Sequence, residues 1–418
     1  MPDIDVVVIG AGQAGLSISH CLSRSGIEHV VLERDAVGAS WQSARWSSFC
    51  LVTPNWATRL AGRSYDGDEP DGFMPRDELL QWLRKYATDF AVPVHAPVTV
   101  TAVIPRSDGR YELPTLQGST FVCRAVVVAT ATHAHAKIPA FSGSLDASIA
   151  QVHASQYRDP QSLAAGGVMV VGSAQSGCQF ADELLRAGRS VWLVTGRTGR
   201  LPRRYRGRDI IAWQQAMGFL DRPASALEEP AHRFRPDPHL TGARGGETLD
   251  LRELSQRGAQ LTGRLHAIAG RVATFDSDLD ANLGFADEFA ARVSGDVDAY
   301  ISRESVKAPR ADSANSDLGY QGERFFPQYP SQLDLVAAGI TTVIWATGFR
   351  HDFTWVQAPV FDQSGYPIQS NGLTALPGLH FLGLNYVERR GSGILYGVGE
   401  DAEQLGHVIR SFLAHRSN

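Results

Sequence analysis

The feature that most constrains this chain is a glycine-rich turn that occurs twice. Each copy follows a short apolar run and precedes a helical stretch. The first, DVVVIGAGQAGLSI, has Gly10, Gly12 and Gly15 in G-x-G-x-x-G spacing. The second, VMVVGSAQSGCQF, repeats this at a constant offset with Gly172 and Gly177, but Ala174 holds the middle place. Strand, turn and helix in this order begin a parallel α/β unit that binds a dinucleotide.

In the first copy each glycine has a mechanical task. Gly10 allows the tight turn, Gly12 lets a pyrophosphate approach the backbone, and Gly15 lets the helix pack against the strand. The returning strand HVVLE ends at Glu33, whose carboxylate can accept ribose hydroxyls, and the adjacent Arg34 is a further cofactor-binding candidate. An ordinary glycine-rich loop is the alternative, but it does not explain the order of strand, turn, helix and terminal acid.

The second copy differs in its charge preference. Its returning strand ends at Thr195 in place of an acid, and Arg197 follows. A carboxylate there would repel a 2′-phosphate, whereas an arginine can bind one bidentately. A solvated basic loop around Arg197 is the alternative. We therefore predict FAD at the first turn and NADPH at the second, where the turn residues are Gly172, Ser173, Gln175, Ser176 and Gly177.

Two further apolar runs complete the expected fold. AVVVATATH, ending near Thr130 and Ala131, and TTVIWATGF, with Thr347 and Gly348, both look like strands of the flavin domain. A C-terminal helix is expected to begin near Glu400 or Asp401 and to point its N-terminus at the flavin. The prediction is an α/β protein with two Rossmann-like dinucleotide-binding domains: an FAD domain of residues 1–160 and 335–418, and an NADPH domain of residues 161–334.

A small helical insertion, around residues 203–330, is expected within the NADPH domain. GRLHAIAGRVATF reads as a hairpin, and ANLGFADEFAARVSGDVDAYISRES as an amphipathic helix. An inserted helix beside a cofactor cleft could be a substrate lid or the contact of a homodimer. The arginines in RRYRGR could hold the NADPH phosphates or attract an acidic substrate.

Composition excludes several functions. With 39 basic and 44 acidic residues the net charge is −5, without long blocks of one sign, so neither nucleic acid nor an anionic membrane is an expected partner. No apolar run approaches the roughly 20 residues that span a bilayer, and we expect a cytoplasmic protein. The four cysteines form no C-x-x-C pair, which excludes a dithiol relay. His133 and His135 have no accompanying ligand cluster, so no metal is expected.

The chain resembles the class B flavin-containing monooxygenases, and more closely the bacterial flavoproteins associated with cation-efflux systems. The likeness runs almost from end to end: GAGQAG, GASW with Trp41, FMPRDELLQWL, VVGSAQSG, IWATGF and GVGEDA occur in the family's order. The family hallmark F-x-G-x-x-x-H, followed four residues later by an aromatic residue, is partly present. His153 and Tyr157 match it, but Ala147 and Ile149 stand in the Phe and Gly places.

This resemblance implies a flavin-dependent cycle. NADPH reduces FAD, O₂ adds to flavin C4a, and the resulting (hydro)peroxide oxygenates a nitrogen or sulfur of a small-molecule substrate. The alternative is an NAD(P)H-dependent flavin reductase or oxidase without substrate oxygenation; nothing in the sequence favours a non-catalytic sensor.

The resemblance also implies catalytic candidates. The family often has a Thr-Asn pair whose amide lies near the flavin; here Pro54 separates Thr53 from Asn55, which could equally be a turn residue. Arg45 could line the flavin pocket. His153 is expected to orient the linker between the domains.

Overall fold

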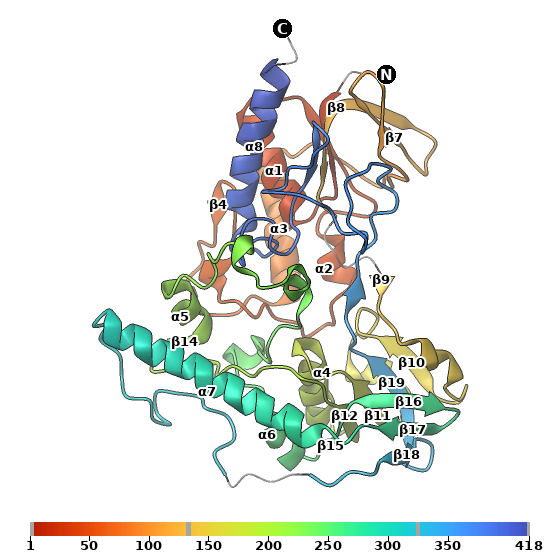
Figure 1. The fold of residues 1–418 in the computed structure, drawn as a ribbon, viewed down its shortest axis with the longest axis vertical. Coiled ribbons are helices and arrows are strands. Elements are labelled where there is room, and N and C mark those ends of the chain that lie inside the picture. The colour runs from red at the N-terminus through yellow and green to blue at the C-terminus, as the bar shows by residue number, and fades with distance from the viewer. Residues whose placement is uncertain (1–3, 131–134, 323–326, 416–418) are drawn as a thin grey trace.

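Two sheets, one in each half of the molecule, are built around the two glycine turns (Figure 1). The computed structural model describes residues 4–130, 135–322 and 327–415. Both termini lie at the end of the molecule that holds the first sheet, and the second sheet lies at the opposite end (Figure 1). The predicted α/β class with two Rossmann-like units is confirmed.

The first sheet has the order β5-β2-β1-β8-β7-β6, with β21 also paired to β8. Strand β1 lies between β2 and β8, and from Val6 to Ile9 it is apolar on both faces, as is typical of a central parallel strand. The parallel strands are β1 (Ile4–Ile9), β2 (His29–Leu32), β5 (Val94–His95), β8 (Thr120–Val128) and β21 (Leu379–Phe381), and the antiparallel ones are β6 (Ile104–Pro105) and β7 (Tyr111–Pro114).

Helices cover this sheet and lead to the candidate site. The predicted C-terminal helix is present and begins at Val398, slightly before the expected start. It packs closely on the first helix, since a side chain at Gly406 would come within 3.0 Å of Cys21. The elements are α1 (Gln13–Arg24), α2 (Ala39–Ser43), the hairpin β3 (Arg59–Leu60) and β4 (Arg63–Ser64), α3 (Arg76–Asp89) and α8 (Val398–His415).

The second sheet is fully parallel, with the order β10-β19-β11-β12-β15. The predicted hairpin is present as β16 and β17, and β18 extends it to three antiparallel strands. The bounds are β10 (Ala150–His153), β11 (Gly167–Val171), α4 (Gln175–Arg186), β12 (Val191–Val194), α6 (Leu251–Gln256), β15 (Gln260–Thr262), β16 (Leu265–Ala269), β17 (Val272–Phe275), β18 (Gln332–Asp334) and β19 (Ile340–Trp345).

The assignment of Thr341–Phe349 to the flavin domain was wrong. Strand β19 pairs with β10 and β11 in the second sheet, just as β8 pairs with β1 in the first. Each glycine turn thus has its own third strand, whose end lies against the turn: a side chain at Gly10 would lie 2.9 Å from the Ala129 carbonyl oxygen, and one at Gly172 would lie 2.6 Å from that of Ala346. The second unit therefore extends beyond residues 161–334 at both ends, since β10 also belongs to it.

The two units are connected by a pair of short strands. Strands β9 (His135–Ala136) and β20 (Phe349–Arg350) run antiparallel where the chain crosses between the sheets. Figure 1 shows them between the upper and lower halves. Ala131 and His133 lie outside the described residues.

The insertion packs against both units. Its elements are β13 (Arg204–Tyr205), β14 (Arg208–Asp209), α5 (Ile210–Ala216), α7 (Leu279–Arg303) and the 3₁₀ helices Ala224–Ala226, Pro230–Phe234 and Ala243–Gly245. Three further 3₁₀ helices lie outside the insertion, at Asn55–Ala57, Ala140–Ser144 and Pro160–Ser162. The apolar stripe of α7 is largely covered by the chain itself, with Leu283 and Val297 buried.

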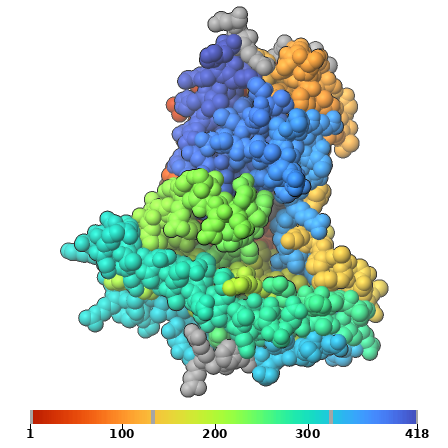
Figure 2. Space-filling model, in the orientation of Figure 1, coloured from red at the N-terminus to blue at the C-terminus, as the bar shows by residue number. Residues whose placement is uncertain are grey.

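One segment of the insertion also reaches the first unit. Ala224 N–H donates to the Glu388 carbonyl at 2.7 Å, and Gly391 N–H donates to that of Leu220 at 2.7 Å. Figure 2 shows this green segment between the blue C-terminal part and the teal α7.

Candidate functional site

The first glycine turn has an open side and a closed side. Gly10 has φ +104°, in the left-handed region that favours glycine. A side chain at Gly15 would lie 1.8 Å from the Gly10 carbonyl oxygen, so only glycine lets α1 approach β1 this closely. At Gly12, by contrast, an added methyl would meet no atom within 4 Å. The space above Gly12 can therefore take a ligand.

The second turn repeats this geometry. Gly172 has φ +106°, and a side chain at Gly177 would lie 1.8 Å from the Gly172 carbonyl oxygen. Ala174 takes the place of Gly12, and its methyl group keeps a ligand further from the backbone of the turn. The two turns thus share one backbone path but differ in how closely they admit a ligand.

The helices that follow the two turns have free N-termini. Gly12 caps α1 and Ala174 caps α4, and neither provides a side-chain hydrogen bond to the first turn. Neither helix has an acidic residue in its first turn. Unpaired backbone N–H groups and the positive end of the helix dipole favour an anion, so both positions suit a pyrophosphate.

In each unit a hydrogen bond joins the glycine turn to the end of the second strand. The turn supplies the donor in the first unit and the acceptor in the second. In the first, the Glu33 carboxylate accepts from Ala11 N–H at 2.7 Å. In the second, the turn residue Ser173 accepts from Gly196 N–H, beyond the strand end, at 3.0 Å. The same link is therefore made with a negative charge in the first unit and without one in the second.

Arg197 follows the second strand end and keeps an exposed guanidinium. Its charged group lies 4.8 Å from the ring centre of Phe285. Among the described residues no carboxylate forms an ion pair with it. The neighbouring Thr195 hydroxyl donates to the Thr262 carbonyl at 2.7 Å. This strand end is therefore polar and cationic, whereas the Glu33 end is anionic.

The C-terminal loop and α8 close over the first turn. The Gln13 side chain donates to the Gly393 carbonyl at 2.8 Å. Asp401, in the first turn of α8, is buried, and neither of its carboxylate oxygens has a hydrogen-bond partner among the described groups. Arg389 lies 3.7 Å away. Burial raises the pKa of Asp401 to about 6, and a ligand hydroxyl would supply the missing donor.

Asn55 is buried at the start of a 3₁₀ helix. Its side-chain amide donates to the Glu69 carbonyl at 2.9 Å, while its side-chain oxygen is buried without a partner in the described structure. Its backbone N–H donates to the Gly72 carbonyl at 2.9 Å. The geometry is that of a turn residue, with one acceptor left available.

The remaining first-unit candidates differ in exposure. The Arg45 guanidinium lies 5.4 Å from the ring centre of Trp41, and burial lowers its pKa. Arg34 is exposed and pairs with Asp35 at 3.2 Å. Thr130 is exposed directly after β8.

His153 contacts the crossover segment, and Tyr157 contacts a residue of α4 that also bonds to the first unit. The His153 ring donates from Nε2 to the Gly348 carbonyl at 3.0 Å, where the chain crosses back through Phe349. Burial lowers the pKa of His153, so the ring is neutral near pH 7. Tyr157 donates to Glu183 of α4 at 2.8 Å. The His153 contact holds the returning crossover segment, and the Tyr157 contact holds the connection between β10 and β11 against α4, so both are positioning tasks.

The predicted use of the arginines in RRYRGR was wrong for Arg203, and for Arg206 it stays a prediction. Arg203 is fully buried, pairs with Asp209, and donates to the Val52 carbonyl at 2.9 Å. Arg206 pairs with Asp298 at 2.8 Å. Both charges are neutralised inside the insertion, because their carboxylate partners lie beside them in the folded chain.

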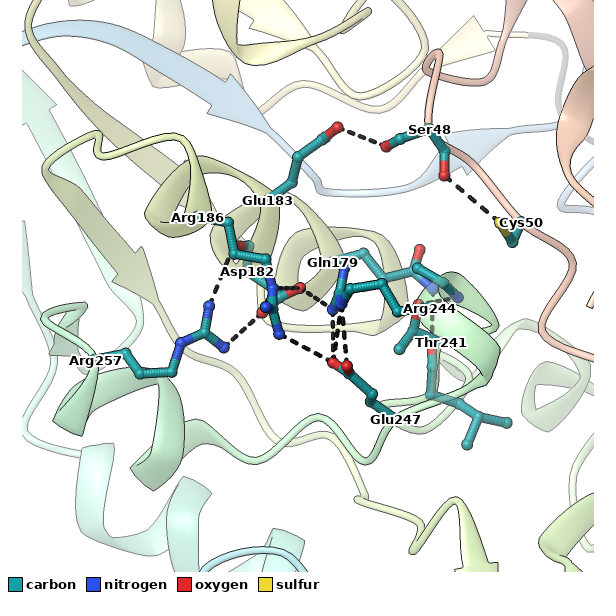
Figure 3. A network of polar contacts seen from close by, with 12 residues as sticks. Ser48, Cys50, Gln179, Asp182, Glu183, Arg186, Thr241, Arg244, Glu247 and Arg257 are labelled. Atoms are coloured by element: carbon teal, nitrogen blue, oxygen red, sulfur yellow. Dashed lines mark hydrogen bonds and ion pairs between the residues drawn. The ribbon is translucent and has the colours of Figure 1, made fainter.

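A polar network on α4, which sequence reasoning missed, is shown in Figure 3. Asp182 is buried and bonded to Arg186 at 3.2 Å and to Arg244 and Arg257 at 2.6 Å each. Burial opposes ionisation, but the guanidinium groups prevail and hold the pKa of Asp182 below its ordinary value. The next residue, Glu183, accepts from Ser48 of the first unit at 2.5 Å. The network joins α4 to its neighbours, and no local sequence motif predicts it.

The described residues hold neither a cluster of metal ligands nor a membrane-spanning helix. No group of three or more His, Cys, Asp or Glu side chains in these residues could hold a metal ion. Within the same ranges, no helix is long and apolar enough to cross a membrane.

Comparison with known proteins decides the family. The family described as pyridine nucleotide-disulphide oxidoreductase matches residues 7–208. Over 416 residues the chain is 32% identical to an uncharacterized CzcO-like oxidoreductase of Geobacillus kaustophilus, with 99% of each chain covered. The chain belongs to the CzcO-like oxidoreductases, a class B flavin monooxygenase-like family. The resemblance read from its motifs is confirmed.

Solved structures show the same fold for this CzcO-like oxidoreductase. The flavin-containing monooxygenase of Stenotrophomonas maltophilia superimposes with a TM-score of 0.68 at 20% identity, over 99% of this chain and 100% of that one. OTEMO in complex with FAD and NADP gives a TM-score of 0.56 at 16% identity, over 100% of this chain and 87% of the other. Both comparisons support the two-unit architecture.

Proposed function

We propose that this oxidoreductase is an FAD- and NADPH-dependent monooxygenase that oxygenates a nitrogen or sulfur atom of a small molecule. The observation that carries the proposal is the charge difference between two otherwise matching turns. Each has an uncapped helix N-terminus, but Glu33 ends one strand and Arg197 follows the other. An enzyme that brings two unlike dinucleotides together can pass a hydride from one to the other.

The first unit would hold FAD. Gly10, Gly12 and Gly15 shape the turn for its pyrophosphate, and Glu33 retains lone pairs to accept from the adenosine ribose. Asp401 provides two buried acceptors that lack donors, which fits the hydroxyl groups of a flavin side chain. When bound, FAD accepts a hydride and supplies the chemistry that activates O₂.

The second unit would hold NADPH. Free N–H groups at the start of α4 would receive the pyrophosphate, and Arg197 would bind the 2′-phosphate. The chain's remaining tasks are positioning and exclusion of water. His153 holds the crossover segment at Gly348, Tyr157 supports Glu183 of α4, and Asn55 offers a buried acceptor. The solved fold neighbour that binds both FAD and NADP supports this pairing.

The test measures where the electrons of NADPH go. The purified holoenzyme is mixed with NADPH, ¹⁸O₂ and panels of amines, sulfides and ketones, and product and H₂O₂ are both quantified. Label in an amine or sulfide product, in proportion to NADPH consumed, is the expected result. Consumption that yields only H₂O₂ with every substrate would instead make the protein an NADPH oxidase.

A further inference from the structure

The first part of the inserted helix α7 lies directly on the loop that follows β12. Asn282, Phe285 and Phe289, spaced by three and four residues, share one face of the helix. Their partners are Thr195, Arg197 and Gly199 in turn. The contact is close, since a side chain at Gly199 would lie 2.5 Å from the ring of Phe289. One helix face thus contacts the first part of this loop at three positions.

Asn282 forms a hydrogen bond to the residue that follows β12. It is buried, and its side-chain amide donates to the Thr195 hydroxyl at 3.1 Å. That hydroxyl in turn donates to the Thr262 carbonyl. Thr195 stands where Glu33 stands in the first unit, so α7 completes the hydrogen bonds of the strand end without a carboxylate.

Two acidic groups near this loop, Asp250 and Asp287, are already paired. Arg200 binds Asp250 at 3.1 Å and Asp287 at 3.2 Å, and Asp287 also binds Arg252 at 2.6 Å. Arg197 has no such partner in the described part of the chain. Its positive charge therefore remains available to an anion.

Phe285 gives Arg197 a fixed support. A guanidinium stacked on an aromatic face is attracted to the ring and keeps its N–H groups at the rim. The ring takes up none of the hydrogen-bond donors, so they stay free for a planar or tetrahedral anion. A flexible arginine would have to be ordered on binding, and stacking reduces that entropic cost.

We infer that α7 forms a wall of the second dinucleotide site and that Phe285 is a positioning residue that presents Arg197 to the 2′-phosphate of NADPH. This inference rests on the proposed function. It assigns the preference for NADPH over NADH to the inserted helix as well as to the glycine unit. The insertion is then a specificity element of the cofactor site.

The experiment is calorimetric titration of the FAD-loaded protein with NADP⁺ and with NAD⁺. The variants are Phe285→Ala, Phe285→Tyr, Arg197→Ala and the control Val293→Ala, a half-buried apolar residue on the same helix. Phe285→Ala should raise the Kd for NADP⁺ by about three- to tenfold and leave the Kd for NAD⁺ within twofold. Phe285→Tyr, which keeps the ring, and Val293→Ala should both match the parent.

The outcomes separate this inference from the proposed function. If Phe285→Ala leaves both constants unchanged, or weakens both equally, while Arg197→Ala weakens only NADP⁺, the role of α7 is refuted and the NADPH assignment stands. If the parent itself binds NADP⁺ no more tightly than NAD⁺, both are overturned.

Discussion

Tyr157 donates its hydroxyl hydrogen to Glu183 at 2.8 Å, and Ser48 donates to the other oxygen of the same carboxylate at 2.5 Å. Glu183 belongs to α4 of the second unit, whereas Ser48 belongs to the first. Partial burial raises the pKa of Glu183, so each donor helps to keep the half-buried carboxylate ionised. Tyr157, a catalytic candidate by its place in the family hallmark, is therefore part of a contact between the units.

Replacing Tyr157 by phenylalanine should lower stability more than it changes chemistry. The loss of a buried hydrogen bond to a charged group should lower the free energy of unfolding by about 1–3 kcal/mol at pH 7.5. Urea denaturation measures this, with Ser48→Ala as a control whose effect should be smaller because Ser48 is exposed. A variant with parental stability and no NADPH consumption would instead give Tyr157 a chemical role.

Alanine substitutions at Gly12 and Gly15 should separate binding from folding. Gly12 has φ −85° and ψ −170°, which alanine adopts freely, and its methyl would enter open space. Gly12→Ala should therefore keep the stability of the apoprotein within about 0.5 kcal/mol but weaken FAD binding about tenfold. Gly15→Ala should prevent correct folding, because its methyl would overlap the Gly10 carbonyl. Thermal unfolding of the apoprotein and fluorescence titration with FAD test both, and parental FAD affinity in Gly12→Ala would contradict the site.

Asp401→Asn should stabilise the apoprotein and weaken the holoprotein. The folded pKa of Asp401 is about 6, above its ordinary value of 3.8, so its contribution to stability is fully present below about pH 4 and is lost as pH rises through 6. The asparagine variant should gain up to about 3 kcal/mol over the parent at pH 8 and nothing at pH 4. Denaturation of the two apoproteins at both pH values measures the gain.

The same variant should bind FAD several-fold more weakly, because it loses a carboxylate acceptor. FAD titration at pH 8 gives the second readout. Equal FAD affinity in the two proteins would remove Asp401 from the site.

His380→Leu should make the protein less sensitive to acid. His380 is buried in β21, neither ring nitrogen has a hydrogen-bond partner among the described groups, and burial lowers its pKa to about 4. The unfolded chain binds a proton on this ring near pH 6.5, so the parent loses stability as pH falls from 6.5 to 4. The leucine variant should lose about 3 kcal/mol less across that range. Urea denaturation at pH 7, 5 and 4 tests this. The same dependence of the free energy of unfolding on pH in the parent and the variant would contradict it.

Local patterns predicted the two units well, and the misplaced strand shows where they stop. The run ending in Trp345 is rich in β-branched residues and is mostly buried on both faces, which suits a central strand of either parallel sheet. Nothing within it specifies its neighbour, so likeness of motif suggested the wrong sheet. The prediction for Arg203 was wrong for a similar reason. This residue follows β12 closely in the sequence, but the fold buries it beside Asp209 and Phe73.

Residues that sequence reasoning missed have no motif of their own. Asn282 and Phe285 occur in an ordinary amphipathic pattern, and their importance appears only when α7 lies on the loop after β12. The sequence pattern likewise places Asp182 and Glu183 on the solvent-facing side of a helix. Their partners come from segments far away in the chain.

The sequence by itself determined the two glycine turns, because at Gly10, Gly15, Gly172 and Gly177 the constraint is local: a Cβ there would meet a backbone carbonyl or require an unfavourable φ. It also determined the contrast between Glu33 and Arg197. Only the tertiary structure decided which sheet received β19, which arginines were neutralised and which helix supports Arg197. Those outcomes depend on charges and apolar faces that meet across long sequence separations, where packing of the whole chain selects the partners.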